Sequence, residues 1–121
     1  VKPILAPSCN SIYEYGCSCM SLLKNLGYPI SGMDAKQLQN NTPPNYAPQR
    51  GDIALFKYRD KKTGEPIYHA ASVLWSYPSK NFEIIEWNYR AGEETRRVMS
   101  PSDKNLTGFI HNDNFSPQLP L

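Results

Sequence analysis

Two cysteines separated by one serine, Cys17-Ser18-Cys19, are the first residues of this sequence whose types and spacing could do chemistry. Such a pair can form one side of a metal site, take part in a disulfide, or supply a thiol nucleophile. The third cysteine is Cys9. Because three cysteines cannot all pair within one chain, at least one thiol is free or pairs elsewhere.

The stretch that begins at Cys19 has the spacing of an amphipathic helix. The residues that share one predicted helical face are Cys19, Leu22, Leu23 and Leu26. Ser18 is the expected N-cap, Gly27 follows the last turn, and Pro29 prevents continuation. Unpaired N–H groups at a helix start stabilise a thiolate, which is the reactive form of cysteine. Cys19 is therefore placed where a nucleophile would be.

A histidine and two polar residues fall on matching faces of two later strands. On the strand predicted at 68–77, the residues of one face are His69, Ala71, Val73 and Trp75. On the strand predicted at 82–89, they are Phe82, Ile84, Glu86 and Asn88, while Trp87 points the other way. In an antiparallel pair the start of one strand lies beside the end of the next. We therefore expect His69 to lie within reach of Glu86 or Asn88.

Together these residues fill the three roles of thiol-dependent acyl transfer. Cys19 would be the nucleophile, and His69 would be its general base. Glu86 or Asn88 would hold the imidazole in one tautomer and orientation. A carboxylate inside an apolar strand such as Glu86 also needs a partner, because otherwise burial neutralises it.

The elements that must position these residues are helices followed by strands. A second short helix is expected within 33–40, and a Pro-rich connector follows at 40–51. Period-two patterns predict strands at 52–58, 68–77 and 82–89, with weaker candidates at 95–99 and 107–111. This order predicts an α+β fold, with short N-terminal helices packed on a twisted antiparallel sheet of about five strands.

Length and charge limit the classes of function. The 121 residues fit a single domain, 1–121, and a net charge of +2 gives no support for nucleic-acid binding. No apolar run approaches the roughly 18 residues that a membrane-spanning helix needs, so we expect no membrane partner. The chain begins Val1-Lys2-Pro3, and we expect it to be an excised domain or a processed fragment of a longer protein.

Five segments in order give the chain a resemblance to a known family. They are CSCMSLLKNLG, GDIALF, HAASVL, IIEWNY and GFI, within about residues 10–111. In order and rough spacing the sequence resembles the cysteine, histidine-dependent amidohydrolase/peptidases, the CHAP family of phage endolysins and bacterial cell-wall hydrolases. The resemblance implies a papain-like α+β catalytic domain that hydrolyses peptidoglycan amide bonds. We expect no cofactor and no metal ion.

Residue by residue, the resemblance assigns Cys19 as nucleophile and His69 as general base. Glu86 matches the acidic orienting residue, and Asn88 matches the polar residue two positions later. Cys19 would form a thioester that water activated by His69 releases. The backbone N–H of Cys19 would help to stabilise the oxyanion, a contribution typically worth about 3 kcal/mol.

The sequence departs from the family at two places. Ser18 stands where many relatives carry glutamine, which leaves Asn10, Tyr13 and Tyr15 as candidates for the side-chain oxyanion donor. Residues 1–18 contain no aspartate, so we predict no calcium site of the kind that some relatives hold there.

Alternatives remain for several of these residues. Cys19 could be an inert buried thiol, and Cys17 could be the nucleophile instead. If the protein acts outside a cell, Cys9 could form a disulfide with Cys17 or Cys19, and only the bond to Cys17 would be compatible with activity. A zinc site built from the three cysteines and a histidine has unfavourable spacing, because zinc clamps separate their ligands by two to four residues. His111 is interpreted as a surface residue, and Asp52 as a turn-making residue outside the catalytic set. The segments RDKKTGE and RAGEETRR are interpreted as solvated loops.

Three rival functions follow. The first is a bacteriolytic peptidoglycan hydrolase that acts at the bacterial cell wall, phage-derived or secreted, with a flanking wall-binding or virion module as a further partner. The second is a non-enzymatic structural or wall-binding module on the same fold, such as a phage virion component. A papain-like cysteine enzyme that acts on proteins is a third option.

Overall fold

The structure is a computed structural model that describes residues 19–30, 34–87, 89 and 93–120. Its helical elements are α1 (Cys19–Asn25) and the single 3-10 turn η1 (Ala35–Gln37). Its strands are β1 (Ile53–Arg59), β2 (Pro66–Ser76), β3 (Phe82–Trp87), β4 (Glu94–Met99) and β5 (Leu106–Ile110).

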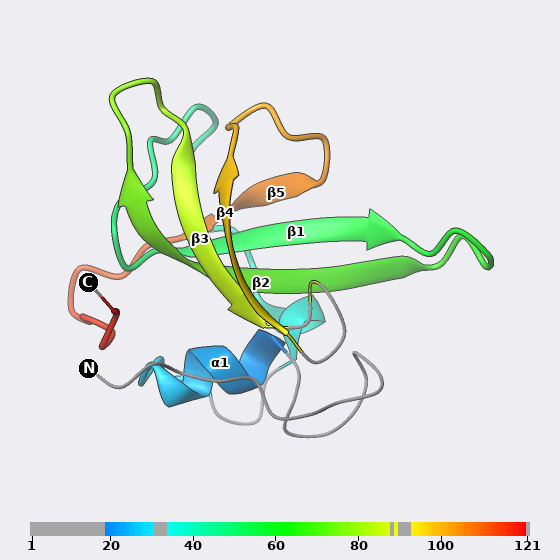
Figure 1. Cartoon of the computed structure of the whole chain (residues 1–121), viewed down its shortest axis with the longest axis horizontal. Coiled ribbons are helices and arrows are strands. Elements are labelled where there is room, and N and C mark those ends of the chain that lie inside the picture. The colour runs from blue at the N-terminus through cyan, green and yellow to red at the C-terminus, as the bar shows by residue number, and fades with distance from the viewer. Residues whose placement is uncertain (1–18, 31–33, 88, 90–92, 121) are drawn as a thin grey trace.

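The five strands form one antiparallel sheet in the order β4-β3-β2-β1-β5 (Figure 1). The predicted α+β class and the five strands are confirmed, with boundaries that differ by one or two residues. The helical part is smaller than expected, because the predicted helix within 33–40 is reduced to the one turn of η1 and the sheet dominates. In the described residues, no helix is long and apolar enough to cross a membrane.

β2 is the strand that connects the two halves of the sheet. Its first part pairs with β1 from Pro66 to Ser72, and its last part pairs with β3 from Ser72 to Ser76. The strand bends between these parts, and the β1–β2 hairpin extends beyond the rest of the sheet (Figure 1). Pairing with β3 begins at Ser72 opposite Ile85, so His69 lies beside the end of β3.

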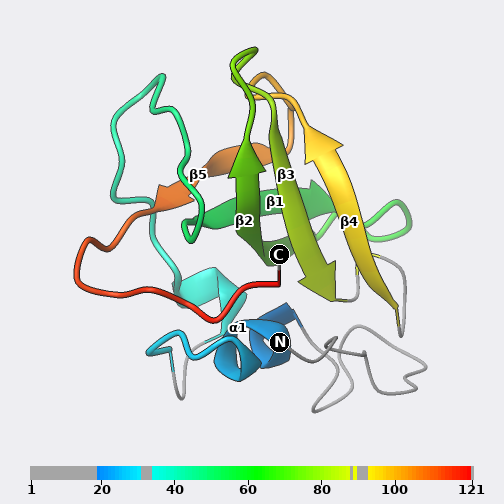
Figure 2. The same cartoon turned by 60° about the vertical axis from the view of Figure 1, so that its left-hand side comes forward.

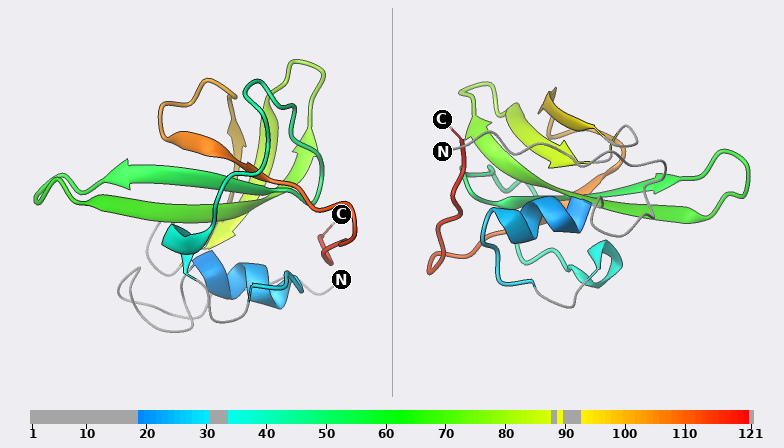
Figure 3. Two further views of the ribbon diagram at one scale, coloured as in Figure 1. Left: turned by 180° about the vertical axis from the view of Figure 1, so that it is seen from behind. Right: turned by 60° about the horizontal axis from the view of Figure 1, so that its bottom comes forward.

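α1 lies against one face of the sheet (Figures 2 and 3). The predicted helical face is confirmed, because Cys19 and the three leucines are buried in one cluster with residues of β1, β2 and β3. The helix ends in a Schellman motif, in which Gly27 N–H bonds to Lys24 C=O and Tyr28 N–H bonds to Leu23 C=O. Gly27 has φ of +94°, which only glycine adopts readily.

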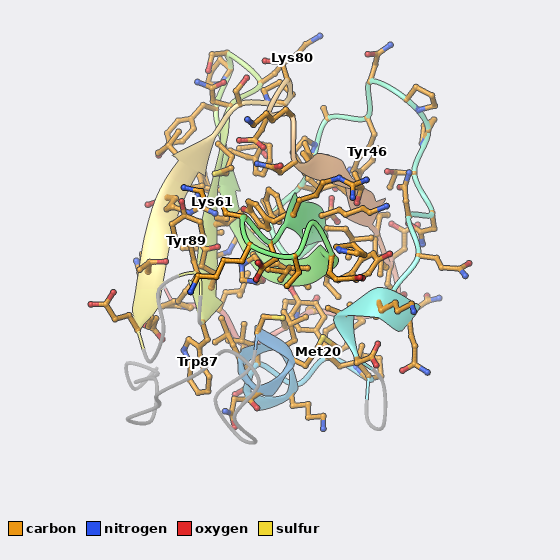
Figure 4. The ribbon with its side chains drawn as sticks, turned by 90° about the vertical axis from the view of Figure 1, so that its right-hand side faces the viewer. Met20, Tyr46, Lys61, Lys80, Trp87 and Tyr89 are labelled. Atoms are coloured by element: carbon orange, nitrogen blue, oxygen red, sulfur yellow. The ribbon has the colours of Figure 1, made fainter. Side chains whose placement is uncertain are left out.

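Alternation along the strands divides the buried residues into two clusters. Ile85 and Trp87 face α1, whereas Phe82 and Ile84 face the other way. The predicted orientation of Trp87 is therefore confirmed, and Figure 4 shows this side chain near α1. The prediction for Trp75 is wrong. A register shift after Val73 pairs Trp75 with Glu83, which turns it away from the face of His69 and leaves it exposed.

Candidate active site

The first residue of α1 and a residue in the first half of β2 form the centre of the candidate site. Cys19 lies beside His69, close enough to raise the pKa of the imidazole. Both are largely buried, with 8% of Cys19 and 7% of His69 exposed. The contact joins residues 50 positions apart in the sequence.

The other side of the imidazole ring contacts a carboxylate. His69 Nε2 lies 2.7 Å from Glu86 Oε1, and Glu86 has no exposed surface. Because Glu86 occupies Nε2, Nδ1 is the ring nitrogen left to face Cys19. The prediction that His69 reaches Glu86 across neighbouring antiparallel strands is confirmed.

Two further donors reach Glu86 from β4. Arg97 Nε donates to Oε2 at 2.5 Å, and its Nη2 donates to Oε1 at 3.1 Å. The Thr95 hydroxyl donates to Oε2 at 3.1 Å. The interpretation of RAGEETRR as a solvated loop is therefore wrong at its C-terminal end, because these residues belong to β4. One signal in the sequence could have identified Arg97: it alternates with Met99, which is buried.

The electrostatic environment keeps the imidazole and the carboxylate charged. Burial alone would lower the pKa of His69, but hydrogen bonds and negative charge at Cys19 and Glu86 raise it to about 9. Burial alone would raise the pKa of Glu86, but the hydrogen bonds and positive charges of His69 and Arg97 hold it below its usual range. At neutral pH the site therefore contains an imidazolium beside a carboxylate.

The raised pKa of His69 makes stability depend on pH. The ordinary value is 6.5, so the stabilising contribution is fully present below about pH 6.5 and is lost as the pH rises through about 9. We expect the difference in unfolding free energy between the native protein and His69→Gln to shrink by roughly 3 kcal/mol between about pH 6 and about pH 10. Urea denaturation followed by tryptophan fluorescence measures this difference, and equal values at the two pH limits would contradict the assignment.

Several predicted site residues lie outside the described part of the chain. They are Asn88, Cys9, Cys17, Ser18 and the oxyanion candidates Asn10, Tyr13 and Tyr15. The structure therefore brings together Cys19, His69 and Glu86 and gives no position for Asn88. Within the described ranges, no group of three His, Cys, Asp or Glu residues could hold a metal ion.

The second histidine forms a separate carboxylate–imidazole cluster. His111 is half-buried instead of being a simple surface residue, with Nδ1 2.6 Å from Asp52 and Nε2 2.6 Å from Asp113. The Tyr46 hydroxyl and the Gln49 backbone N–H also donate to Asp52. Hydrogen bonds to both carboxylates raise the pKa of His111.

This cluster connects the start of β1 to the segment that precedes it, which contains Tyr46 and Gln49, and to the segment that follows β5, which contains His111 and Asp113. It borders a surface hollow of about 340 Å³. Among the described residues that line this hollow none carries a thiol, whereas Cys19 provides one at the other site. His111 is therefore a natural control for His69, since each is paired with a buried carboxylate.

Comparisons with known proteins add no further information about this site. No protein-family model matches the chain, and neither a curated protein nor a solved structure matches it.

Proposed function

We propose that the protein is a cysteine amidohydrolase or endopeptidase of the CHAP type that cleaves an amide bond of bacterial peptidoglycan. The observation that carries the proposal is the grouping of three side chains, in which Cys19 lies beside His69 and His69 Nε2 lies 2.7 Å from Glu86 Oε1. A thiol, an imidazole and an orienting acceptor in this order are the groups that thiol-dependent amide hydrolysis needs. The choice of peptidoglycan as substrate rests on the sequence resemblance. The papain-like fold is part of the same proposal.

The first half of the reaction transfers the acyl group to sulfur. An imidazolium beside a cysteine favours the thiolate, which attacks the carbonyl carbon of the scissile amide. The backbone N–H of Cys19 is one of the first N–H groups of α1 that have no acceptor within the helix, so it can donate to the oxyanion. The carbon–nitrogen bond then breaks, His69 gives its proton to the leaving amine, and a thioester remains on Cys19.

The second half releases the product. His69, now neutral, removes a proton from water, and the resulting hydroxide attacks the thioester carbonyl. The carbon–sulfur bond breaks, the acid product leaves, and the thiolate of Cys19 and the imidazolium of His69 are restored. Glu86 accepts a hydrogen bond from Nε2 throughout, which keeps Nδ1 directed toward the reacting sulfur.

Digestion of purified cell walls tests the proposal. The protein should solubilise walls from at least one of several bacteria, and mass spectrometry of the fragments should identify one kind of new terminus. A free amine on L-alanine with an intact muramic acid would indicate an amidase, and a new peptide terminus would indicate an endopeptidase. Intact walls from every species, together with an unreactive Cys19, would overturn the proposal.

A second candidate function is a non-catalytic module on the same fold. The observation that favours it is the burial of Cys19 among apolar residues of the helix-facing cluster. Most buried thiols are inert. Alkylation by iodoacetamide at several pH values separates the two functions. Rapid labelling of Cys19 below neutral pH favours the enzyme, whereas labelling that rises only near pH 8.5, the ordinary thiol pKa, favours the module.

A further inference from the structure

Arg97 forms a two-point contact with the carboxylate that orients His69. Its Nε and Nη2 donate to different oxygens of Glu86, at 2.5 and 3.1 Å. A guanidinium fork of this kind fixes the plane of a carboxylate, which a single donor cannot do. Arg97 therefore determines the direction in which both oxygens of Glu86 point.

One of these oxygens is shared with the histidine. Glu86 Oε1 accepts from Arg97 Nη2 and also lies 2.7 Å from His69 Nε2. We propose that Arg97 is a positioning residue, which acts through Glu86 to hold the His69 imidazole toward Cys19 and to keep Glu86 ionised at the pH at which the site works. This inference rests on the proposed function and extends it by a residue that the sequence resemblance does not assign.

Arg97 is itself held in place by two tyrosines. Its Nη2 also donates to the Tyr58 hydroxyl at 3.2 Å. Its guanidinium carbon lies 3.4 Å from the centre of the Tyr89 ring, which is a cation–π distance. Figure 4 shows Tyr89 beside β4. These contacts restrict the rotamers of Arg97, so the fork on Glu86 is pre-organised.

The charged and titratable groups of this cluster come from four strands, from the segments that follow β3 and β4, and from the helix. They are Cys19 of α1, Tyr58 of β1, His69 of β2, Glu86 of β3, Tyr89 after β3, Arg97 of β4, and Asp103 after β4, which acts on Tyr58. Thr95 adds a neutral donor to Glu86. Arg97 is the second cation in contact with this buried carboxylate.

A purely structural ion pair makes a different prediction from a positioning residue. Loss of a structural pair would lower stability and would reduce activity by the same factor at every pH. Loss of a positioning cation would allow Glu86 to bind a proton at higher pH, because an opposite charge within a few ångströms lowers a carboxyl pKa by one unit or more. The pH at which activity is lost on the acid side of its pH profile would then rise toward neutral pH.

The experiment measures the alkylation of Cys19 by iodoacetamide against pH, with the modified residue identified by peptide mass spectrometry. The variants are Arg97→Gln, which removes the charge, and Arg97→Lys, which keeps the charge and loses the fork. Arg96→Gln is the matched control, because Arg96 is the exposed neighbour in β4 and pairs with Ile85 of the other face. Thr95→Val removes a neutral donor from the same carboxylate.

We expect the pH at which labelling falls to half its maximum to rise by about one unit in Arg97→Gln. It should stay at the native value in Arg96→Gln and Arg97→Lys and rise by less than in Arg97→Gln in Thr95→Val, which loses only a neutral donor. The maximal labelling rate should fall in Arg97→Lys, because a single ammonium group cannot fix the plane of Glu86. An unshifted half-point in Arg97→Gln, or a shift in Arg97→Lys as large as in Arg97→Gln, overturns the proposal. If Arg97→Gln does not fold, Arg97→Lys provides the test. Because lysine keeps the positive charge, a half-point that shifts in this variant would overturn the proposal, and an unshifted half-point would support it.

The readout separates this inference from the proposed function. Alkylation of Cys19 does not require a wall substrate. If the protein does not lyse walls but the half-point of labelling shifts in Arg97→Gln, the assignment of peptidoglycan as substrate is overturned and the role of Arg97 is retained. Wall lysis with an unshifted half-point would retain the enzyme and overturn the role of Arg97.

Discussion

Replacing Cys19 by alanine should reduce wall lysis by a factor of about 10⁴ or more, because the thiolate is the group that forms the covalent bond to the substrate. His69→Ala should cause a loss of similar size, since nucleophile and base act as one unit. A turbidity assay on purified walls measures both. Circular dichroism should show a folded Cys19→Ala protein, because the substitution removes a single buried sulfur atom.

The chain offers a matched control for each of these variants. Cys17→Ala removes the neighbouring thiol and His111→Ala removes the other histidine, and both should retain lysis within a few-fold. Undiminished lysis by Cys19→Ala would refute the mechanism. Lysis that is lost only in Cys17→Ala would transfer the nucleophile to that residue.

Replacing Glu86 by glutamine should cost about 3 to 5 kcal/mol of unfolding free energy, because the buried His69 and the half-buried Arg97 lose the carboxylate that balances their charges. In the described part of the chain, the hydrogen-bond partners of Glu86 are the donors His69, Arg97 and Thr95. A carboxylate accepts at both oxygens, whereas an amide must direct its NH₂ group at one set of these donors. Urea denaturation measures the cost.

The same variant should also lose activity in whatever fraction remains folded. Without the charge on Glu86, one of the two groups that raise the pKa of His69 is lost, so this pKa falls and the ring loses the carboxylate that fixes its orientation. We expect lysis to fall by about 10² to 10⁴. Glu83→Gln is the control, because Glu83 lies on the same strand and faces the other side, and it should change stability by no more than about 0.5 kcal/mol. A Glu86→Gln protein with native stability and activity would refute the role of the carboxylate.

The sequence by itself determined the elements and the faces of their residues. Helical spacing at Cys19–Leu26 predicted α1 and its buried face, and Gly27 predicted where it ends. Strand alternation placed His69 and Glu86 on one face and Trp87 on the other. These predictions succeeded because periodicity is a local property that depends on backbone geometry and on burial of one side.

The tertiary structure decided which distant residues meet. The bend of β2 brings its first half beside the end of β3, and α1 then places Cys19 against His69. The order of the sheet places β4 next to β3, so Arg97 reaches Glu86. A register shift in β2 turned Trp75 to the other face, against the simple alternation.

His111 is another residue whose position depends on the tertiary structure. Its neighbours in sequence indicated a surface residue, but β5 pairs with β1 and so brings it to the buried Asp52 at the start of β1. Strand order, register and bends depend on how the whole chain packs, and a buried charge obtains its partner only through that packing. The sequence therefore determined that Cys19, His69 and Glu86 could act together, and only the tertiary structure decided that Arg97 completes their contacts.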